Sequence, residues 1–148
     1  MITVERATRI AASASRVWQL FSTEDGQRRA EAGLVASMTF EGEGVGLIRT
    51  LHPEGQAAGQ CVKERLEHYD EANREMAFRI VDTGDIVPFA DHLGFAKVIP
   101  AGETACVLLM RLTFVPVDIG VDQALAIAEE NCRLFIANVR TAVAEEFM

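Results

Sequence analysis

One strand-like segment, residues 60–69, carries a carboxylate among apolar side chains. Alternate side chains of an extended strand point to opposite faces, which gives this segment two unlike sides. The charged face carries Lys63, Arg65 and Glu67, and the mainly apolar face carries Val62, Glu64, Leu66 and His68. We expect the second face to point inward, where a charged and unpaired Glu64 would cost several kcal/mol. Glu64 therefore needs a partner, a water molecule or a proton.

Two side chains on other strand-like segments, Arg49 and His92, are candidate partners for Glu64. Arg49 belongs to the segment that directly precedes the one with Glu64, so we expect these two residues to pair. His92 is predicted to share a face with Ala90 and Gly94. The pair of Arg49 and Glu64 would either close one end of a sheet as a structural ion pair or orient a ligand, and both interpretations stay open.

The remaining chemical motifs indicate neither a metal site nor a cofactor site. His52, His68 and His92 lack the close spacing of metal ligands. Cys61 and His68 fall on opposite faces of one segment, so they do not form a nucleophile with its base. The glycine run at 42–46 is followed by a strand, whereas a phosphate-binding loop requires a helix N-terminus there. We therefore predict no metal and no cofactor.

The periodicity of apolar residues predicts a strand, two short helices, six further strands and one long helix. The expected strands are 2–11, 34–41, 46–52, 60–69, 75–82, 86–99 and 104–115, and the expected helices are 14–22, 25–32 and 121–147. Short connections favour hairpins and hence an antiparallel sheet. The last helix would be about 40 Å long, enough to cross a curved sheet. The pattern predicts one α+β domain over residues 1–148.

The amino-acid composition argues against some classes of binding partner. A chain of 148 residues with 49% hydrophobic residues can build a core and enclose a pocket. Its net charge of −8 argues against nucleic acid. No apolar run approaches the length of a membrane span, and the first residues do not have the pattern of a signal peptide. With three cysteines that we expect to be reduced, the sequence predicts a cytoplasmic protein, and a homodimer stays open.

Three local signatures match one known family. They are the stretch from Ile10 to Trp18 with its Val-Trp pair, Gly46 together with Arg49, and residues 64–70 followed by 78–81. With these signatures the chain resembles the polyketide cyclase/dehydrase-like, START-related (SRPBCC) superfamily of ligand-binding proteins, which includes the birch-pollen allergen type and the plant abscisic-acid receptors. The resemblance covers essentially the whole chain.

The resemblance implies a helix-grip fold, in which a seven-stranded curved antiparallel sheet wraps around the long C-terminal helix and encloses a cavity. Two short helices lie between the first and second strands of this fold. In the receptors, the glutamate that matches Glu64 faces the cavity and joins a polar network around the ligand. The lysine that anchors the hormone carboxylate corresponds to Ala36, so we do not expect a hormone receptor of that type.

We therefore expect the protein to bind a small hydrophobic molecule that is aromatic, polyketide-like or lipid-like. The expected cavity lining is Met38, Phe40, Arg49, Leu51, Val62, Glu64, Phe78, Ile80, His92, Leu108, Met110, Ala128, Cys132 and Phe135. Arg49, Glu64 and His92 would select the polar groups of the ligand. The Gly- and Ala-containing loop 52–59 is the expected lid.

Two alternatives stay open, and the sequence does not decide whether the protein is an enzyme. In a polyketide cyclase/dehydratase-type enzyme, Glu64 or His92 would act as the general base and Arg49 would stabilise an enolate. In an interaction or co-chaperone domain, the interior would be filled, with no cavity above about 300 Å³.

Overall fold

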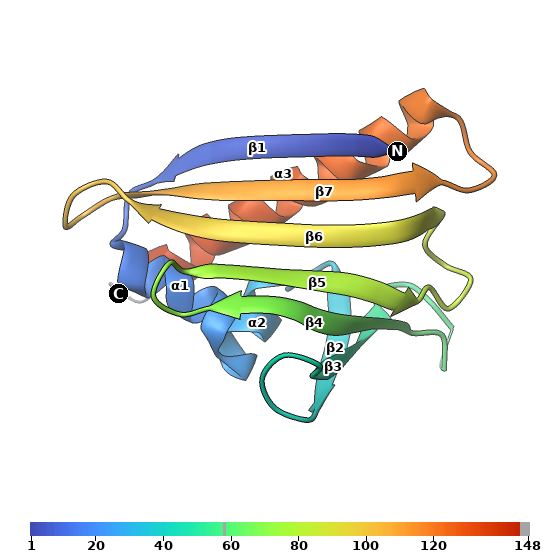
Figure 1. The fold of residues 1–148 in the computed structure, drawn as a ribbon, viewed down its shortest axis with the longest axis horizontal. Helices are drawn as coiled ribbons and strands as arrows, with labels where there is room; N and C mark the ends of the chain where they lie inside the picture. The colour runs from blue at the N-terminus through green and yellow to red at the C-terminus, as the bar shows by residue number, and fades with distance from the viewer. Residues whose placement is uncertain (58, 146–148) are drawn as a thin grey trace.

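Seven antiparallel strands form one sheet in the order β1-β7-β6-β5-β4-β3-β2 (Figure 1). The computed structural model describes residues 1–57 and 59–145. The strands are β1 (Ile2–Ile10), β2 (Val35–Glu41), β3 (Ile48–Pro53), β4 (Val62–Asp70), β5 (Glu75–Asp82), β6 (Phe89–Pro100) and β7 (Cys106–Pro116). The helices are α1 (Ala14–Ser22), α2 (Glu24–Ala30) and α3 (Val121–Glu145). This order confirms the predicted α+β helix-grip fold.

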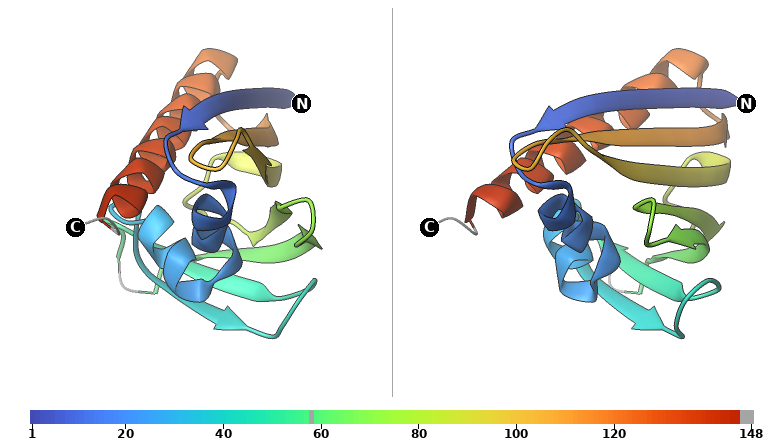
Figure 2. Two further views of the ribbon diagram at one scale, coloured as in Figure 1. Left: turned by 90° about the vertical axis from the view of Figure 1, so that its left-hand side faces the viewer. Right: turned by 60° about the vertical axis from the view of Figure 1, so that its left-hand side comes forward.

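The sheet curves, and the curvature leaves space beside the long helix. β1 and β7 contact α3, whereas β2 turns toward α2 at the other edge (Figure 2). Small buried residues of α3, such as Ala124 and Ala128, let the helix approach β1 and β7 closely. Among the strands, β1 and β7 make the main contacts with α3, and the cavity described below lies between the helix and the central strands.

The first helix begins and packs as its sequence predicts. The Ser13 side chain accepts a hydrogen bond from the Arg16 backbone N–H at 3.3 Å, which caps the helix. Trp18 and Phe21 are then buried on the inner side of α1. The tilted ring of Tyr69 lies 5.7 Å from that of Trp18, so α1 is anchored on β4.

The ends of the elements differ from the predicted ranges by a few residues. β6 begins at Phe89 instead of 86, because residues 83–86 form a turn in which Asp85 has a φ of 58°. β4 begins at Val62 instead of 60. Positions 146 and 147 of the predicted last helix lie outside the described residues. None of the described helices combines the length and apolar character that crossing a membrane requires.

A bulge in β4 changes which side chains of that strand point inward, compared with the prediction. The pairing of β4 with β5 shifts between Leu66 and His68, so the alternation changes phase there. His68 is therefore exposed, and its Nε2 lies 3.0 Å from Oε1 of Glu75. The expectation that His68 shares the inner face with Glu64 is wrong, and Tyr69 turns inward instead.

A second bulge, in β6, changes the predicted neighbours of His92. The register with β7 shifts between Ala90 and Leu93, and Asp91 has a φ of 52°. The extra residue puts Phe89, rather than Ala90, on the same side as His92, with ring centroids 5.9 Å apart. The prediction that His92 shares a face with Ala90 is therefore wrong.

Candidate functional site

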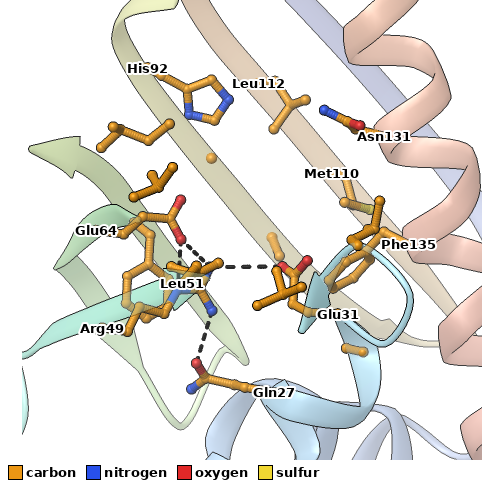
Figure 3. A pocket seen from close by; sticks show the side chains of 18 of the residues that line it. Gln27, Glu31, Arg49, Leu51, Glu64, His92, Met110, Leu112, Asn131 and Phe135 are labelled. Atoms are coloured by element: carbon orange, nitrogen blue, oxygen red, sulfur yellow. Dashed lines mark hydrogen bonds and ion pairs between the residues drawn. The ribbon is translucent and has the colours of Figure 1, made fainter. Parts of the chain in front are cut away.

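A cavity of about 360 Å³ occupies the gap between the sheet, α2 and α3. Its wall is mainly apolar, and Phe21, Phe78, Phe89 and Phe135 line it from four different elements. Figure 3 shows the polar side chains of β3, β4 and α2 on one side and Met110, Asn131 and Phe135 on the other. Such a volume lies above the lower limit of about 300 Å³ for small-molecule sites.

Arg49 is the centre of the polar side of this cavity. Its Nε donates to Oε1 of Glu64 at 2.7 Å, and its Nη2 lies 2.6 Å from the same oxygen. Its Nη1 donates to Oε1 of Gln27 at 2.9 Å. The guanidinium carbon also lies 3.8 Å from the centroid of the Phe78 ring, a cation–π contact. The predicted pair of Arg49 and Glu64 is thereby confirmed.

Strand register brings this pair together. Arg49 and Glu64 are direct cross-strand partners in the antiparallel pairing of β3 with β4. Glu64 also pairs with Ile80 of β5, next to a register shift in β4. Opposite residues on one sheet face are close enough for their side chains to interact. The side chains of Arg49 and Glu64 are each only 11% exposed, which strengthens their attraction relative to a surface pair.

Glu31 is a second carboxylate in the cavity wall, and the sequence pattern did not indicate it. It follows the last residue of α2, and its Oε1 lies 4.0 Å from Nη2 of Arg49. Burial raises the pKa of Glu31 to about 7, against the opposing effect of Arg49, and the charge of Glu64 raises it further. The predicted helix at 25–32 did include this position, but short polar helices lack a periodic signal that assigns an inner face.

Two side chains, Gln27 and Asn138, hold the α2 segment over the cavity with three hydrogen bonds. Gln27 donates from its Nε2 to the backbone oxygen of Phe21 at 2.9 Å, which orients the amide that accepts from Arg49. Asn138 of α3 donates to the backbone oxygens of Ala30 and Ala32 at 3.0 and 2.7 Å. These bonds satisfy carbonyls at the end of α2 and place Glu31 beside Arg49.

His92 lies across the cavity from Gln27 (Figure 3). Its ring stacks near Phe89 and Phe114, with centroids 5.9 and 6.1 Å away. Burial lowers the pKa of His92, although the charge of Glu64 and the backbone of His92 itself act in the opposite direction. Its Nδ1 is buried and has no hydrogen-bond partner among the described residues. The lowered pKa favours the neutral imidazole, which has one donor and one acceptor nitrogen.

Most of the predicted lining residues do border the cavity. They are Arg49, Leu51, Val62, Glu64, Phe78, Ile80, His92, Met110, Cys132 and Phe135. The lining also includes three polar residues that the sequence pattern did not indicate, namely Gln27, Glu31 and Asn131. Of the predicted lid at 52–59, Pro53 borders the cavity, and Ala58 lies outside the described residues.

Four predicted lining residues lie elsewhere. Leu108 and Ala128 are fully buried, and they pack in the part of the core where β7 and α3 touch. Met38 borders a separate hollow of about 230 Å³ between α2 and β2. Phe40 is covered by Arg28, whose guanidinium carbon lies 5.1 Å from the ring centroid. Alternation alone could not show that the sheet meets the helix at one edge and departs from it at the other.

The cavity offers acid–base and charge-stabilising groups instead of a metal centre. Among residues 1–57 and 59–145, no three His, Cys, Asp or Glu side chains gather as a metal site would require. Glu31, Glu64 and His92 can accept hydrogen bonds, and a protonated Glu31 can donate one. Burial raises the pKa of the Cys132 thiol, which makes it a poor nucleophile.

Comparison with solved structures identifies the same fold in several proteins. The protein XoxI from Bacillus cereus is 19% identical with a TM-score of 0.84, and the match covers 100% of this chain and 99% of that one. The Zhui aromatase/cyclase from Streptomyces sp. R1128 is 20% identical with a TM-score of 0.80, covering 99% and 96%. Norcoclaurine synthase from Thalictrum flavum, in complex with dopamine and hydroxybenzaldehyde, is 17% identical with a TM-score of 0.72, covering 97% and 87%.

These structural likenesses establish the fold alone, because each identity is low. No curated protein sequence matches the chain. Residues 1–144, however, match the family described as polyketide cyclase / dehydrase and lipid transport, which confirms the superfamily resemblance. With this match over nearly its whole length, the chain belongs to the polyketide cyclase/dehydrase and lipid transport family.

Proposed function

We propose that this protein binds a small hydrophobic molecule, with an aromatic or polyketide-like skeleton, in the cavity between its sheet and α3. The observation that carries the proposal is a cavity of about 360 Å³ whose apolar wall surrounds one buried ion network. Apolar burial would supply affinity at about 25 cal/mol per Å². The network of Arg49, Glu64 and Glu31 would then orient the polar end of the ligand.

The volume indicates the size of ligand. An apolar cavity of about 150 Å³ holds benzene, so about 360 Å³ has room for a skeleton of about two rings. Phenylalanine rings from α1, β5, β6 and α3 suit an aromatic skeleton because offset and edge-to-face contacts add to simple burial. The same volume argues against the filled interior expected of a pure interaction domain.

A second candidate function is catalysis of the cyclase/dehydratase kind. The observation that favours it is Glu31, a cavity carboxyl with a pKa of about 7 beside a guanidinium. A group with this pKa can both donate and accept a proton near neutral pH. Arg49 would stabilise negative charge on a carbonyl oxygen. The names of the aromatase/cyclase and the norcoclaurine synthase support an enzymatic use of this fold.

Binding is tested with a neutral two-ring probe, 2-naphthalenemethanol. Titration into uniformly labelled protein is expected to shift NMR signals of Leu51, Met110 and Phe135, which line the cavity. The exposed Val45 and Val81 serve as internal controls and should not shift. Shifts confined to surface residues, or no binding by this probe and by smaller neutral aromatics, would refute the proposal.

Catalysis is tested separately. Native mass spectrometry of freshly purified protein identifies a co-purified molecule, and related aromatic ketones or poly-β-carbonyl compounds are then incubated with the protein. If Glu31→Gln loses turnover but still binds the compound, the result would support a catalytic function. If a ligand binds tightly and is still unchanged after long incubation, the result would favour a binding protein without catalytic activity.

A further inference from the structure

We infer that the cavity selects a ligand whose polar end is a protonated amine and discriminates against carboxylates and other anions. This inference rests on the proposed function, because it names the chemical class of the ligand in the same cavity. It follows from how the charges around Arg49 are arranged.

The positive charge of Arg49 is already compensated. Two of its nitrogens contact Oε1 of Glu64, a third donates to Gln27, and its flat face lies on the Phe78 ring. Glu31 lies on the remaining side of Nη2, at 4.0 Å. These hydrogen bonds use three of the five N–H donors of the guanidinium, and an anion that accepted from the other two would lie beside the carboxylates of Glu31 and Glu64. Arg49 is therefore a poor anchor for an anion.

The acceptors of the cavity remain available. Both contacts from Arg49 use Oε1 of Glu64, so the other carboxylate oxygen, Oε2, accepts no hydrogen bond from the described residues. His92 borders the same cavity, and one nitrogen of a neutral imidazole accepts hydrogen bonds. Figure 3 shows Glu31, Glu64 and His92 bordering the same central space. An ammonium group, with three donors and no acceptor, fits such a set of acceptors.

The sum of charges leads to the same class of ligand. When Glu31 is ionised, it forms with Arg49 and Glu64 a group of one positive and two negative charges. One incoming cation makes the group neutral, whereas an anion doubles its excess charge. The phenylalanine faces of the wall also attract cations, and the net charge of −8 repels anions before they reach the cavity.

No second cation in the described lining offsets this preference. Glu31 faces Arg49 of β3 and Glu64 of β4. Arg28 of the preceding helix α2 borders the separate hollow that Met38 also lines. Burial lowers the pKa of His92 of β6, which favours its neutral form. From α3 the neighbours are Asn131 and the thiol of Cys132, whose pKa burial raises.

The preference should depend on pH because Glu31 must be ionised to bind the amine. With its pKa at about 7, about a tenth of Glu31 is ionised at pH 6 and about nine tenths at pH 8. Affinity for an amine should therefore rise several-fold, and up to about tenfold, between these pH values. A neutral alcohol of the same skeleton should bind almost equally at both.

The test compares three matched compounds by isothermal titration calorimetry at pH 8 and pH 6: 2-naphthylmethylamine, 2-naphthalenemethanol and 2-naphthoic acid. At pH 8 we expect the amine to bind at least tenfold more tightly than the acid, with the alcohol between them. An acid that binds as tightly as the amine overturns the inference, while binding of the alcohol keeps the proposed function. Failure of all three compounds to bind refutes the proposed function and the inference with it.

A variant isolates the role of Glu31. Glu31→Gln should reduce the advantage of the amine over the alcohol at pH 8 and remove the rise of this advantage with pH. Glu43→Gln makes the same charge change at an exposed turn and should leave all three affinities unchanged. An amine advantage that is as large in Glu31→Gln as in the original protein, and that rises with pH in the same way, overturns the inference. The pH comparison on the unmodified protein decides the question if that variant does not fold.

Discussion

Arg49 and Glu64 are direct cross-strand partners, and one carboxylate oxygen, Oε1, receives both Nε and Nη2 of the arginine. Each side chain is 11% exposed, so neither charge is well solvated. The pairing of β3 with β4 fixes the backbones of the two residues, and their side chains border the cavity. This arrangement links the stability of β3 and β4 to the chemistry of the cavity.

Removing one charge of this pair should destabilise the fold. Glu64→Gln leaves Arg49 without its main counter-charge, although Gln27, Phe78 and Glu31 still contact it. We expect a loss of about 2–3 kcal/mol in the free energy of unfolding, below the 3–5 kcal/mol typical of fully buried pairs. Urea unfolding monitored by circular dichroism measures this loss.

Two further variants define the cause of that loss. Glu67 contacts Arg65 and Arg79 on the outer face of the same strand, so Glu67→Gln should have little effect. The double variant Arg49→Leu with Glu64→Leu should recover part of the stability, because a buried pair is often replaceable by apolar residues. A loss in Glu64→Gln no larger than in Glu67→Gln would contradict the role given to burial.

Glu31 should make the protein less stable as the pH rises from about 4.5 to 7. Its pKa is raised by burial from an ordinary 4.5 to about 7, so over this range the folded protein keeps a proton that the unfolded chain has released. Its contribution is greatest below pH 4.5 and is lost as the pH approaches 7. A shift of this size corresponds to at most about 3 kcal/mol.

Comparison with Glu31→Gln removes the contributions of the other titrating groups to the pH dependence of stability, because both proteins contain those groups. The free energy of unfolding of this variant minus that of the original protein should increase from pH 5 to pH 8 by up to about 3 kcal/mol. Equilibrium urea unfolding at several pH values measures it. A difference that stays constant with pH would mean that Glu31 is ionised normally in the folded protein.

His92 should gain a proton at a lower pH than an ordinary histidine does. Burial lowers its pKa, and the negative charge of Glu64 partly opposes this effect. Glu64→Gln should therefore lower the pKa of His92 further. NMR titration of the imidazole signals measures both values, and an increase in the pKa upon this substitution would show that Glu64 does not act on His92 through its charge.

The sequence was sufficient for the fold because strand alternation and the α3 stripe are long periodic signals. The pair of Arg49 and Glu64 was also predictable, since consecutive hairpin strands pair and both residues have inward apolar neighbours. His68 and Ala90 were assigned wrongly because each lies beside a bulge. A bulge changes the phase of alternation and leaves little trace in the residue pattern.

Glu31 could not be assigned in the same way. Its position depends on how α2 docks, and that docking is fixed by tertiary bonds from Asn138 to the backbone oxygens of Ala30 and Ala32. Leu108 and Ala128 face inward as predicted, but they lie where β7 and α3 touch. Which inward residues line a cavity depends on the curvature of the sheet, and no local periodicity reports it.

Larger side chains at Gly94 should distinguish the effect of filling the cavity on stability from its effect on ligand binding. Gly94 borders the cavity, and a Cβ at this position would meet its nearest atom, Cδ2 of Leu112, at an ordinary 3.5 Å. Gly94→Ala should stabilise the fold by about 0.4–1 kcal/mol, because glycine loses more backbone freedom on folding. Gly94→Leu should occupy part of the cavity and weaken binding of 2-naphthalenemethanol at least tenfold while the fold persists.

Gly120 provides the matched control, because a Cβ there meets no atom within 4 Å and the residue lies outside the cavity lining. Gly120→Leu should leave the affinity for the probe unchanged. Melting temperatures and calorimetric titrations of the three variants are measured together. If Gly94→Leu melts at or above the temperature of the original protein and still binds the probe at full strength, then the probe does not occupy the space that Gly94 borders, and the cavity is not its site.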